Sequence, residues 1–491
     1  MKKLNKRDKL KMNYKLIFKL IGNVLRIEAL FMLFPFVVSL IYGDGDHWTF
    51  LWSILILAIT GTLLAILKPK DKNFRARDAF AVAGFSWVLF SLFGALPFYF
   101  SGCFNSFIDC VFESISGFTT TGATILTNIE ILPKGILFWR SFSHWIGGMG
   151  VLMFVMAVMP STNASSVNLL RAESTGPAPD KVVPKIRETA KIMYLIYLAM
   201  TVLLIFLLKI AGLPVYDSFA NAFSTAGTGG FSVMNASIES YNNVAAEIII
   251  SIFMFLFGIS FTLYFFFLGR KFIKIIKDSE IKFYFVIVIS SIIIITINIS
   301  GIYGGIAEAL RHSSFQVSSI ISTTGFSTTD FNLWPTLSQV ILILLMITGC
   351  CAGSTGGGMK LIRILILLKA AKIELGKIFH PGSVKAVSVN GKKINNDIVS
   401  KTALFFFIYF AVFIASVMLI SIEGKDIVSS STAVIASISN IGPGFGTVGP
   451  AGNFSAFSAF SKIILSFCMI AGRLEFFPVL ILFTFSPWKR K

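Results

Sequence analysis

The sequence is poor in charged residues, which make up only 14% of its 491 positions, whereas soluble proteins contain about 25%. Acidic residues are the scarcer sign, with 24 Asp and Glu against 43 Lys and Arg. Apolar stretches of the roughly 20 residues that cross a bilayer recur along the chain, beginning with residues 16–42 and 49–67. The composition excludes an ordinary soluble domain and predicts an all-α polytopic membrane protein.

Cysteine and histidine are also scarce, with five and four residues, and none has the spacing of a metal site. Cys103 and Cys110 lie on the predicted outer side, where they could form a disulfide or act as small apolar fillers. His144, beside Trp145, is interpreted as a helix-packing residue. No Ser/His/Asp or Cys/His arrangement indicates hydrolysis, so we expect neither an enzyme nor a tightly bound cofactor.

The excess of basic residues follows the pattern of a membrane topology. Most Lys and Arg residues lie in segments 1–15, 68–77, 161–191, 270–282, 360–401 and 489–491. These segments fall on the same side of the predicted spans if each re-entrant loop returns to its own side. The positive-inside rule then places all six, with both termini, in the cytoplasm. Inner-leaflet anchoring therefore explains the net charge of +19, and no nucleic-acid partner is expected.

Four short segments are variations on one glycine-centred motif, each preceding a long apolar stretch. They are Thr120-Thr121-Gly122-Ala123-Thr124, Thr228-Gly229-Gly230-Phe231-Ser232, Thr323-Thr324-Gly325-Phe326-Ser327 and Gly442-Pro443-Gly444-Phe445-Gly446. Backbone carbonyls of such loops can replace the water shell of a cation. The candidate ion-binding residues are Thr120, Thr121, Gly122, Thr228, Gly229, Gly230, Thr324, Gly325, Gly442, Pro443 and Gly444. Four such loops predict a cation-conducting pore, with potassium favoured.

The motif belongs to a larger repeat of span, short re-entrant helix, glycine loop and span. We expect a basic N-terminus with a two-helix hairpin at 1–70, followed by repeats at 71–165, 166–278, 279–380 and 381–491. The second spans are expected at 135–160, 244–269, 336–370 and 459–485. Non-helical backbone at membrane depth must be buried or line a cavity. A pseudo-fourfold arrangement of the loops around one pore satisfies that requirement.

Acidic residues stand near the expected starts of the short helices. Asp109 and Asp217 each precede the glycine of their loop by 13 residues, and Glu308 and Asp426 occupy looser equivalents. An acid there caps free N–H groups and suits the positive end of the helix dipole. The negative end would then point toward the pore and favour a cation, although capping alone is an alternative.

A second motif interrupts the long apolar segment of the third repeat. It comprises Gly349, Cys350, Cys351, Ala352, Gly353, Ser354, Thr355, Gly356, Gly357 and Gly358. Because each glycine costs a helix up to about 1 kcal/mol relative to alanine, the helix should break here. The break could obstruct the pore and move, or be a passive kink. A phosphate-binding loop is excluded because Lys360 follows Met359 rather than glycine.

Ionisable residues inside apolar spans are costly and usually face the bundle interior. Arg473 and Glu475 lie in the last span; Arg473 could form one gate with the interrupted segment, or could form a structural pair with Glu475 or contact loop carbonyls. Arg140 and Glu113 are interpreted as structural residues that buttress the first loop.

The segments 116–124, 223–232 and 440–446 resemble the loops of the Trk/Ktr/HKT potassium-transporter superfamily, and the N-terminal hairpin favours its Trk-type membrane subunit. The resemblance implies potassium uptake across the bacterial cytoplasmic membrane by a homodimer, with a pore in each chain. It implies a gating loop at 349–358, with Arg473 beneath the filter, and a cytosolic nucleotide-binding partner ring. It also implies carbonyl-supporting glycines at Gly122, Gly230, Gly325 and Gly444.

Two details bear on the resemblance. Gly122, rather than serine, leans toward potassium over sodium, whereas Gly227 stands where a bulkier residue is expected. The basic segments 270–282 and 360–401 are expected to dock the partner ring. A weakly selective potassium/sodium pathway, a secondary carrier for a small solute and an intramembrane enzyme remain as alternatives; two inverted halves would favour a carrier, and four parallel units favour a pore.

Overall fold

The computed structural model describes residues 13–69, 76–150, 186–380, 382 and 385–479, and this part of the chain is almost entirely helical. Within it, six helices are long and apolar enough to cross a membrane, or seven if one bent pair counts as a span. The expected all-α class of membrane protein is therefore confirmed. Both termini, with residues 1–12 and 480–491, lie outside the described residues, as do 70–75 and 151–185.

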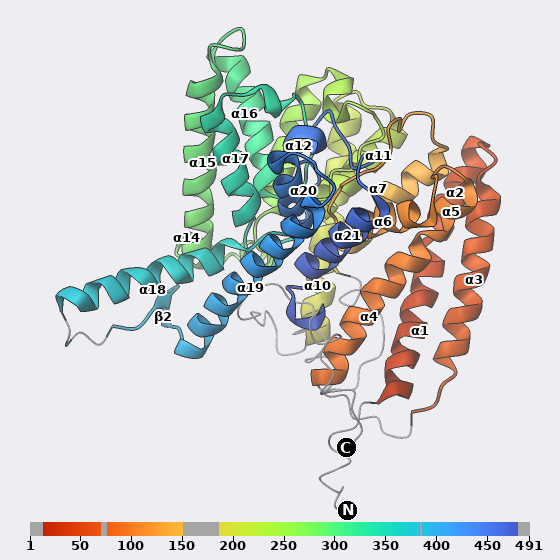
Figure 1. The fold of residues 1–491 in the computed structure, drawn as a ribbon, viewed down its shortest axis with the longest axis horizontal. Coiled ribbons are helices and arrows are strands. Elements are labelled where there is room, and N and C mark those ends of the chain that lie inside the picture. Colours follow the sequence, from red (N-terminus) through yellow and green to blue (C-terminus); the bar gives the residue numbers. More distant parts are fainter. Residues whose placement is uncertain (1–12, 70–75, 151–185, 381, 383–384, 480–491) are drawn as a thin grey trace, which may run out of the picture.

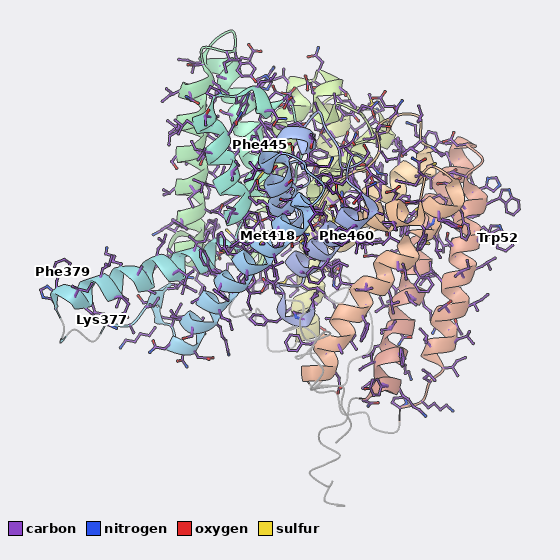
Figure 2. All side chains as sticks on the ribbon, in the orientation of Figure 1. Trp52, Lys377, Phe379, Met418, Phe445 and Phe460 are labelled. Carbon is purple, nitrogen blue, oxygen red and sulfur yellow. The ribbon has the colours of Figure 1, made fainter. Side chains whose placement is uncertain are left out.

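The N-terminal helices form a flank of their own. They are α1 (Tyr14–Phe31), α2 (Leu33–Tyr42) and α3 (His47–Ala65), at the right of Figure 1. Glycine lets α1 and α3 approach closely, since a Cβ on Gly22 would lie 2.6 Å from the Gly61 carbonyl oxygen. Trp52, 55% exposed, points away from the body in Figure 2, as a lipid-facing aromatic residue would.

The remaining helices follow in four successive sets along the chain. The first set is α4 (Ala76–Gly94), α5 (Leu96–Ser101), α6 (Phe107–Phe118) and α7 (Lys134–Gly148). The second is α10 (Ile186–Ile210), α11 (Val215–Gly227), α12 (Val244–Phe257) and α13 (Phe261–Leu268), followed by the short α14 (Phe272–Ile276). The third is α15 (Ser279–Ile299), α16 (Ile306–Ile321), α17 (Thr336–Thr348) and α18 (Leu361–Phe379). The last is α19 (Asn396–Ser421), α20 (Ile427–Ser439) and α21 (Ala459–Arg473).

The short helices α6, α11, α16 and α20 carry mostly buried small and polar residues. Ser429, Ser430, Thr432, Ser437 and Ser439 of α20 are all buried, for example. In Figure 1, α20 and α21 lie at the centre, with α15–α17 on one flank and α1–α4 on the other. The polar short helices are thus surrounded by long apolar ones, whose outward side chains are exposed.

Two of the expected second spans are broken. Residues 349–360 separate α17 from α18, as the glycine-rich motif predicts. The span expected at 244–269 is not one straight helix, because α12 and α13 meet at a bend of 94°. At this bend the space beside Gly258 is filled by the Tyr284 hydroxyl, 2.5 Å from where a Cβ would lie.

Helix α18 leaves the body sideways and ends at Phe379, which is 79% exposed (Figures 1 and 2). The chain then forms a small antiparallel hairpin, β1 (Ser388–Val389) and β2 (Lys392–Lys393), in which Ser388 pairs with Lys393. Asn390 at its turn donates to the Asp278 carboxylate at 2.6 Å, just before α15. The hairpin is therefore tied to the start of the third repeat.

Candidate functional site

Each of the four short helices starts with an acidic residue in or beside its first turn. Asp109, Asp217 and Glu308 lie in the first turns of α6, α11 and α16. Asp426 caps α20 by accepting the Ser429 N–H at 2.8 Å. That bond lowers the pKa of Asp426. The acids satisfy or complement the free N–H ends of these helices.

The four loops share one backbone conformation. The residue two positions before the glycine is left-handed in every loop, with φ of 56°, 55°, 61° and 56° at Thr120, Thr228, Thr323 and Asn440. The glycines follow with φ of 75°, 77°, 86° and 98° at Gly122, Gly230, Gly325 and Gly442. Between them, the N–H groups of Thr121, Gly229, Thr324 and Ile441 donate to carbonyls five residues earlier, at 2.8–2.9 Å. Residues other than glycine rarely adopt such angles. The recurrence of a left-handed residue at the same position in all four loops therefore marks them as one structural motif.

The loops also approach one another in chain order. A Cβ added to Gly122 would lie 1.8 Å from the Gly229 carbonyl oxygen, and one added to Gly230 would lie 2.0 Å from the Thr324 oxygen. In the same way, a Cβ on Gly325 would lie 2.0 Å from the Ile441 oxygen, and a Cβ on Gly442 would lie 2.8 Å from the Thr121 oxygen. Each glycine therefore faces a backbone carbonyl of the next loop, and the fourth faces the first. Both the space and the positive φ exclude a side chain at these positions.

This comparison corrects one assignment in the fourth loop. Gly442, rather than Gly444, has the conformation and neighbours of Gly122, Gly230 and Gly325. A Cβ on Gly444 would instead meet the Thr432 side chain at 2.8 Å. The two glycines stand two positions apart in the sequence, and their backbone angles and neighbours distinguish them. Pro443 follows the corrected glycine and lies beside Gly325, whose Cβ would be 2.8 Å from its Cδ.

The buried pair of Glu113 and Arg140 supports the first two loops from behind. Arg140 Nη2 lies 2.8 Å from Glu113 Oε1, and both side chains are at most 1% exposed. Glu113 also accepts the Thr124 hydroxyl at 2.9 Å and the Ile125 N–H at 3.1 Å. Arg140 donates to the Ser232 carbonyl at 3.3 Å. The interpretation of these residues as buttresses agrees with these contacts.

His144 has a more specific environment than its interpretation as a packing residue suggested. Its Nδ1 lies 2.7 Å from the Gly117 carbonyl oxygen, and its Nε2 accepts the Phe231 N–H at 3.2 Å. A Cβ on Gly229 would lie 2.2 Å from the imidazole Cγ, and one on Gly227 2.2 Å from the His144 carbonyl oxygen. The unexpected Gly227 is thus explained by contact with α7. No sequence pattern pairs residue 144 with residue 231.

The segment 349–360 lies against the C-terminal ends of α16 and α20. Gly357 N–H donates to the Thr323 hydroxyl at 2.7 Å, and Gly358 N–H donates to the Ser439 carbonyl at 2.9 Å. A Cβ on Gly356 would lie 2.6 Å from the Ser322 oxygen, and one on Gly357 2.3 Å from the Ser439 oxygen. The glycines therefore let this segment, called the intramembrane loop below, touch the backbone of the third and fourth loops' helices.

Two cationic side chains donate to carbonyls of the intramembrane loop. Arg473 donates to the Thr355 oxygen at 2.9 Å and to the Gly148 oxygen, at the end of α7, at 2.8 Å. Lys360, 1% exposed, donates to the Gly356 oxygen. Arg473 thus makes the loop-carbonyl contacts that were one alternative for it. Glu475 pairs with Arg363.

The other end of the intramembrane loop is fastened by Glu280 of α15, which the sequence did not single out. Its Oε1 accepts the Ala352 N–H at 2.7 Å and the Ile362 N–H at 3.1 Å, so it binds the chain before Gly353 and after Gly358. The loop also exchanges backbone bonds with the bend between α12 and α13. Cys351 N–H donates to the Gly258 oxygen at 3.1 Å, and Phe261 N–H donates to the Gly353 oxygen at 3.0 Å.

Cysteines play no bridging part in this arrangement. Cys103 and Cys110 are both free thiols, and Cys110, Cys350, Cys351 and Cys468 are buried. Among the described residues, His, Cys, Asp and Glu side chains form no group that could hold a metal ion.

Comparisons with known proteins agree with this architecture. Residues 47–488 match the family model "TrkH: Cation transport protein". The Trk system potassium uptake protein TrkH of Salmonella typhimurium is 36% identical over 97% of this chain and 100% of its own length. TrkG of Escherichia coli is 34% identical over 95% of this chain and 97% of its own length.

A solved structure extends the likeness to the fold. The crystal structure of the potassium transporter TrkH from Vibrio parahaemolyticus matches with a TM-score of 0.88 and 32% identity, over 97% of this chain and 100% of that one. The resemblance identified from the loop segments is confirmed by these matches. This chain is a multi-pass membrane protein and belongs to the TrkH family of cation transport proteins.

Proposed function

We propose that this chain takes up potassium across the bacterial cytoplasmic membrane through a filter built by its four glycine loops. The observation that carries the proposal is the contact of each loop glycine with a carbonyl of the next loop, around all four. Such a closed order is what a pseudo-fourfold pore requires. The relatives named as potassium uptake proteins support the choice of ion.

In this proposal the carbonyl groups around Thr121, Gly229, Thr324 and Ile441 replace the water shell of potassium. The residues Thr120, Thr228 and Gly444 are the neighbours that shape these carbonyl positions. The short helices present their negative C-terminal ends to the same place, which favours a cation. Entry is driven by the membrane potential, at about 2.3 kcal/mol per 100 mV for one charge.

The intramembrane loop and Arg473 form the proposed gate. The loop lies against the ends of α16 and α20, and Arg473 joins its Thr355 carbonyl to the end of α7. Two positive side chains, Lys360 at the end of this loop and Arg473 beside it, raise the barrier to a cation. Conduction would require the loop to move away from Thr323 and Ser439.

We further propose that the chain works as a homodimer with both termini in the cytoplasm, and that a cytosolic nucleotide-binding ring controls the gate. The ring would dock on the basic segments 270–282 and 360–401, which include α14, α18 and the β1–β2 hairpin. Neutralising these lysines should abolish capture of the purified ring in a pull-down assay, and unchanged capture would contradict the docking site.

The decisive test is the reversal potential of the purified protein in liposomes, with potassium on one side and sodium on the other. A shift toward the potassium equilibrium potential that is lost in Gly122→Ser supports the filter and its ion together. A robust current that reverses near zero would leave a weakly selective cation pathway. Absence of current that persists after deletion of residues 350–355 would favour a carrier over a closed gate.

A further inference from the structure

His144 is held between two backbone groups whose hydrogen-bonding roles are fixed. The Gly117 carbonyl oxygen, 2.7 Å from Nδ1, can only accept, so Nδ1 carries the proton. The Phe231 N–H, 3.2 Å from Nε2, can only donate, so Nε2 is unprotonated. The imidazole is fully buried and lies against the Phe231 ring, with centroids 4.3 Å apart. Its tautomer and its orientation are thereby set.

The bond to Phe231 has a consequence for the preceding residue. In a planar trans peptide the N–H and the C=O point in opposite directions. Fixing the Phe231 N–H toward His144 therefore turns the Gly230 carbonyl away from α7. Because the Gly117 carbonyl, at the end of α6, is bound by the same ring, the first short helix and the second loop are joined through one side chain.

In the second loop, the peptide group that follows the loop glycine is held by a side chain, His144. At the corresponding position, the N–H groups of Ala123 and Phe326 make no hydrogen bond within the described part of the chain, and Pro443 has no N–H. The sequence of the second loop fits the imidazole, because Gly229 leaves room for its ring. A larger residue at 229 would displace it.

We propose that His144 is a positioning residue for potassium selectivity, which holds the Gly230–Phe231 peptide so that the Gly230 carbonyl faces the ion. The inference rests on the proposed function, since it assigns a support to that filter. In this proposal the His144 imidazole sets the direction of the Gly230 carbonyl. In the other three loops of the described chain, the corresponding carbonyl is oriented without such a hydrogen bond.

The test compares His144→Leu with His144→Gln in liposomes, measuring the potassium-to-sodium permeability ratio from reversal potentials. Leucine removes both hydrogen bonds, whereas glutamine keeps one donor and one acceptor. The ratio should fall about tenfold in His144→Leu, which corresponds to about 1.4 kcal/mol, and should stay within about twofold of the wild-type value in His144→Gln. If His144→Leu does not fold, His144→Met serves as the variant without the donor and acceptor pair.

His312→Leu is the matched control. This second buried histidine binds the side chains of Arg311 and Thr328 rather than loop backbone, each at 3.2 Å, and its replacement should leave the ratio unchanged. Equal ratios in wild type and His144→Leu, or equal losses in His144→Leu and His144→Gln, would overturn the inference. A wild-type protein without potassium preference would overturn the proposed function itself, before any variant is compared.

Discussion

The first two loops and the last two are supported in different ways. Behind the first two lie a buried ion pair, Glu113–Arg140, and the His144 imidazole. Behind the last two lie hydroxyl groups: Ser319 donates to the Phe326 carbonyl at 2.6 Å, and Thr432 accepts the Phe445 N–H at 2.9 Å. The backbone of the intramembrane loop, moreover, touches the helices of the last two loops.

The difference separates rigidity from adaptability. When a buried ion pair loses one partner, the remaining side chain is left with an uncompensated charge and has no other group to pair with. A hydroxyl can rotate and exchange donor for acceptor. We infer that the first two loops hold the geometry of the filter, whereas the last two can follow movement of the intramembrane loop. Four substitutions test this contrast, in order of decreasing expected effect.

Replacing Glu113 by Gln should destabilise the protein most, by about 3–5 kcal/mol, because Arg140 is left charged and buried. The midpoint of thermal unfolding in detergent is the measurement. Asp397→Asn is the control, since Asp397 and Lys401 are 61% and 68% exposed, and an exposed pair contributes at most about 1 kcal/mol. Similar shifts of the unfolding midpoint in both variants would contradict the claim that the Glu113–Arg140 pair holds the first two loops rigidly.

Gly357→Ala should disturb the gate and spare the filter. Its new Cβ would lie 2.3 Å from the Ser439 carbonyl oxygen, and such overpacking costs roughly 1–3 kcal/mol. Potassium flux without the partner ring should rise severalfold, with an unchanged potassium-to-sodium ratio. Gly376→Ala on α18 is the control, because nothing lies within 4 Å of its Cβ position. A changed ion ratio with unchanged flux would contradict the assignment.

Glu280→Gln should release the far end of the intramembrane loop more gently. The amide keeps an acceptor for the Ala352 and Ile362 N–H groups but loses the charge, worth about 1 kcal/mol in such bonds. Basal potassium flux should therefore rise about twofold to fivefold. Glu374→Gln, at a side chain that is 69% exposed, should have no effect, and an equal rise there would argue against Glu280 as the residue that holds the intramembrane loop.

Asp426→Ala should have the smallest effect, up to about 1 kcal/mol of stability from the lost cap of α20. The pKa of Asp426 is lowered by the Ser429 N–H, so its contribution is present above the unfolded value of about 4 and is lost as pH falls through the lower folded value. Unfolding midpoints of wild type and variant should converge in acid. If the unfolding midpoints of wild type and variant still differ at low pH, the stability that Asp426 contributes does not come from its carboxylate.

Much of the fold can be predicted from the sequence, since the length of the apolar stretches predicts the spans and the spacing of the glycines predicts the loops. The broken helix at 349–360 is predictable as well, because five glycines in ten residues disfavour a helix. The bend between α12 and α13 is not, since Gly258 alone gives a weak signal and the partners of the freed backbone groups lie in the third repeat.

The finer features of the site depend on contacts between distant residues. Gly442 and Gly444 both fit the motif, and the φ of 98° at Gly442 together with its approach to the Thr121 carbonyl identifies it as the counterpart of Gly122. His144 and Glu280 bind backbone groups 87 and 72 residues away in the chain. Backbone partners have no side-chain signature, so sequence patterns could not reveal these bonds.

The bend between α12 and α13 also has a consequence for biosynthesis. Its Gly258 carbonyl and Phe261 N–H are satisfied by Cys351 and Gly353 of the intramembrane loop. In a bilayer an unsatisfied backbone group costs several kcal/mol. While the ribosome is still translating the third repeat, these two groups lack their native partners. We therefore expect the second repeat to enter the membrane with α12 and α13 as one straight helix, which bends only after residues 351–353 have been inserted.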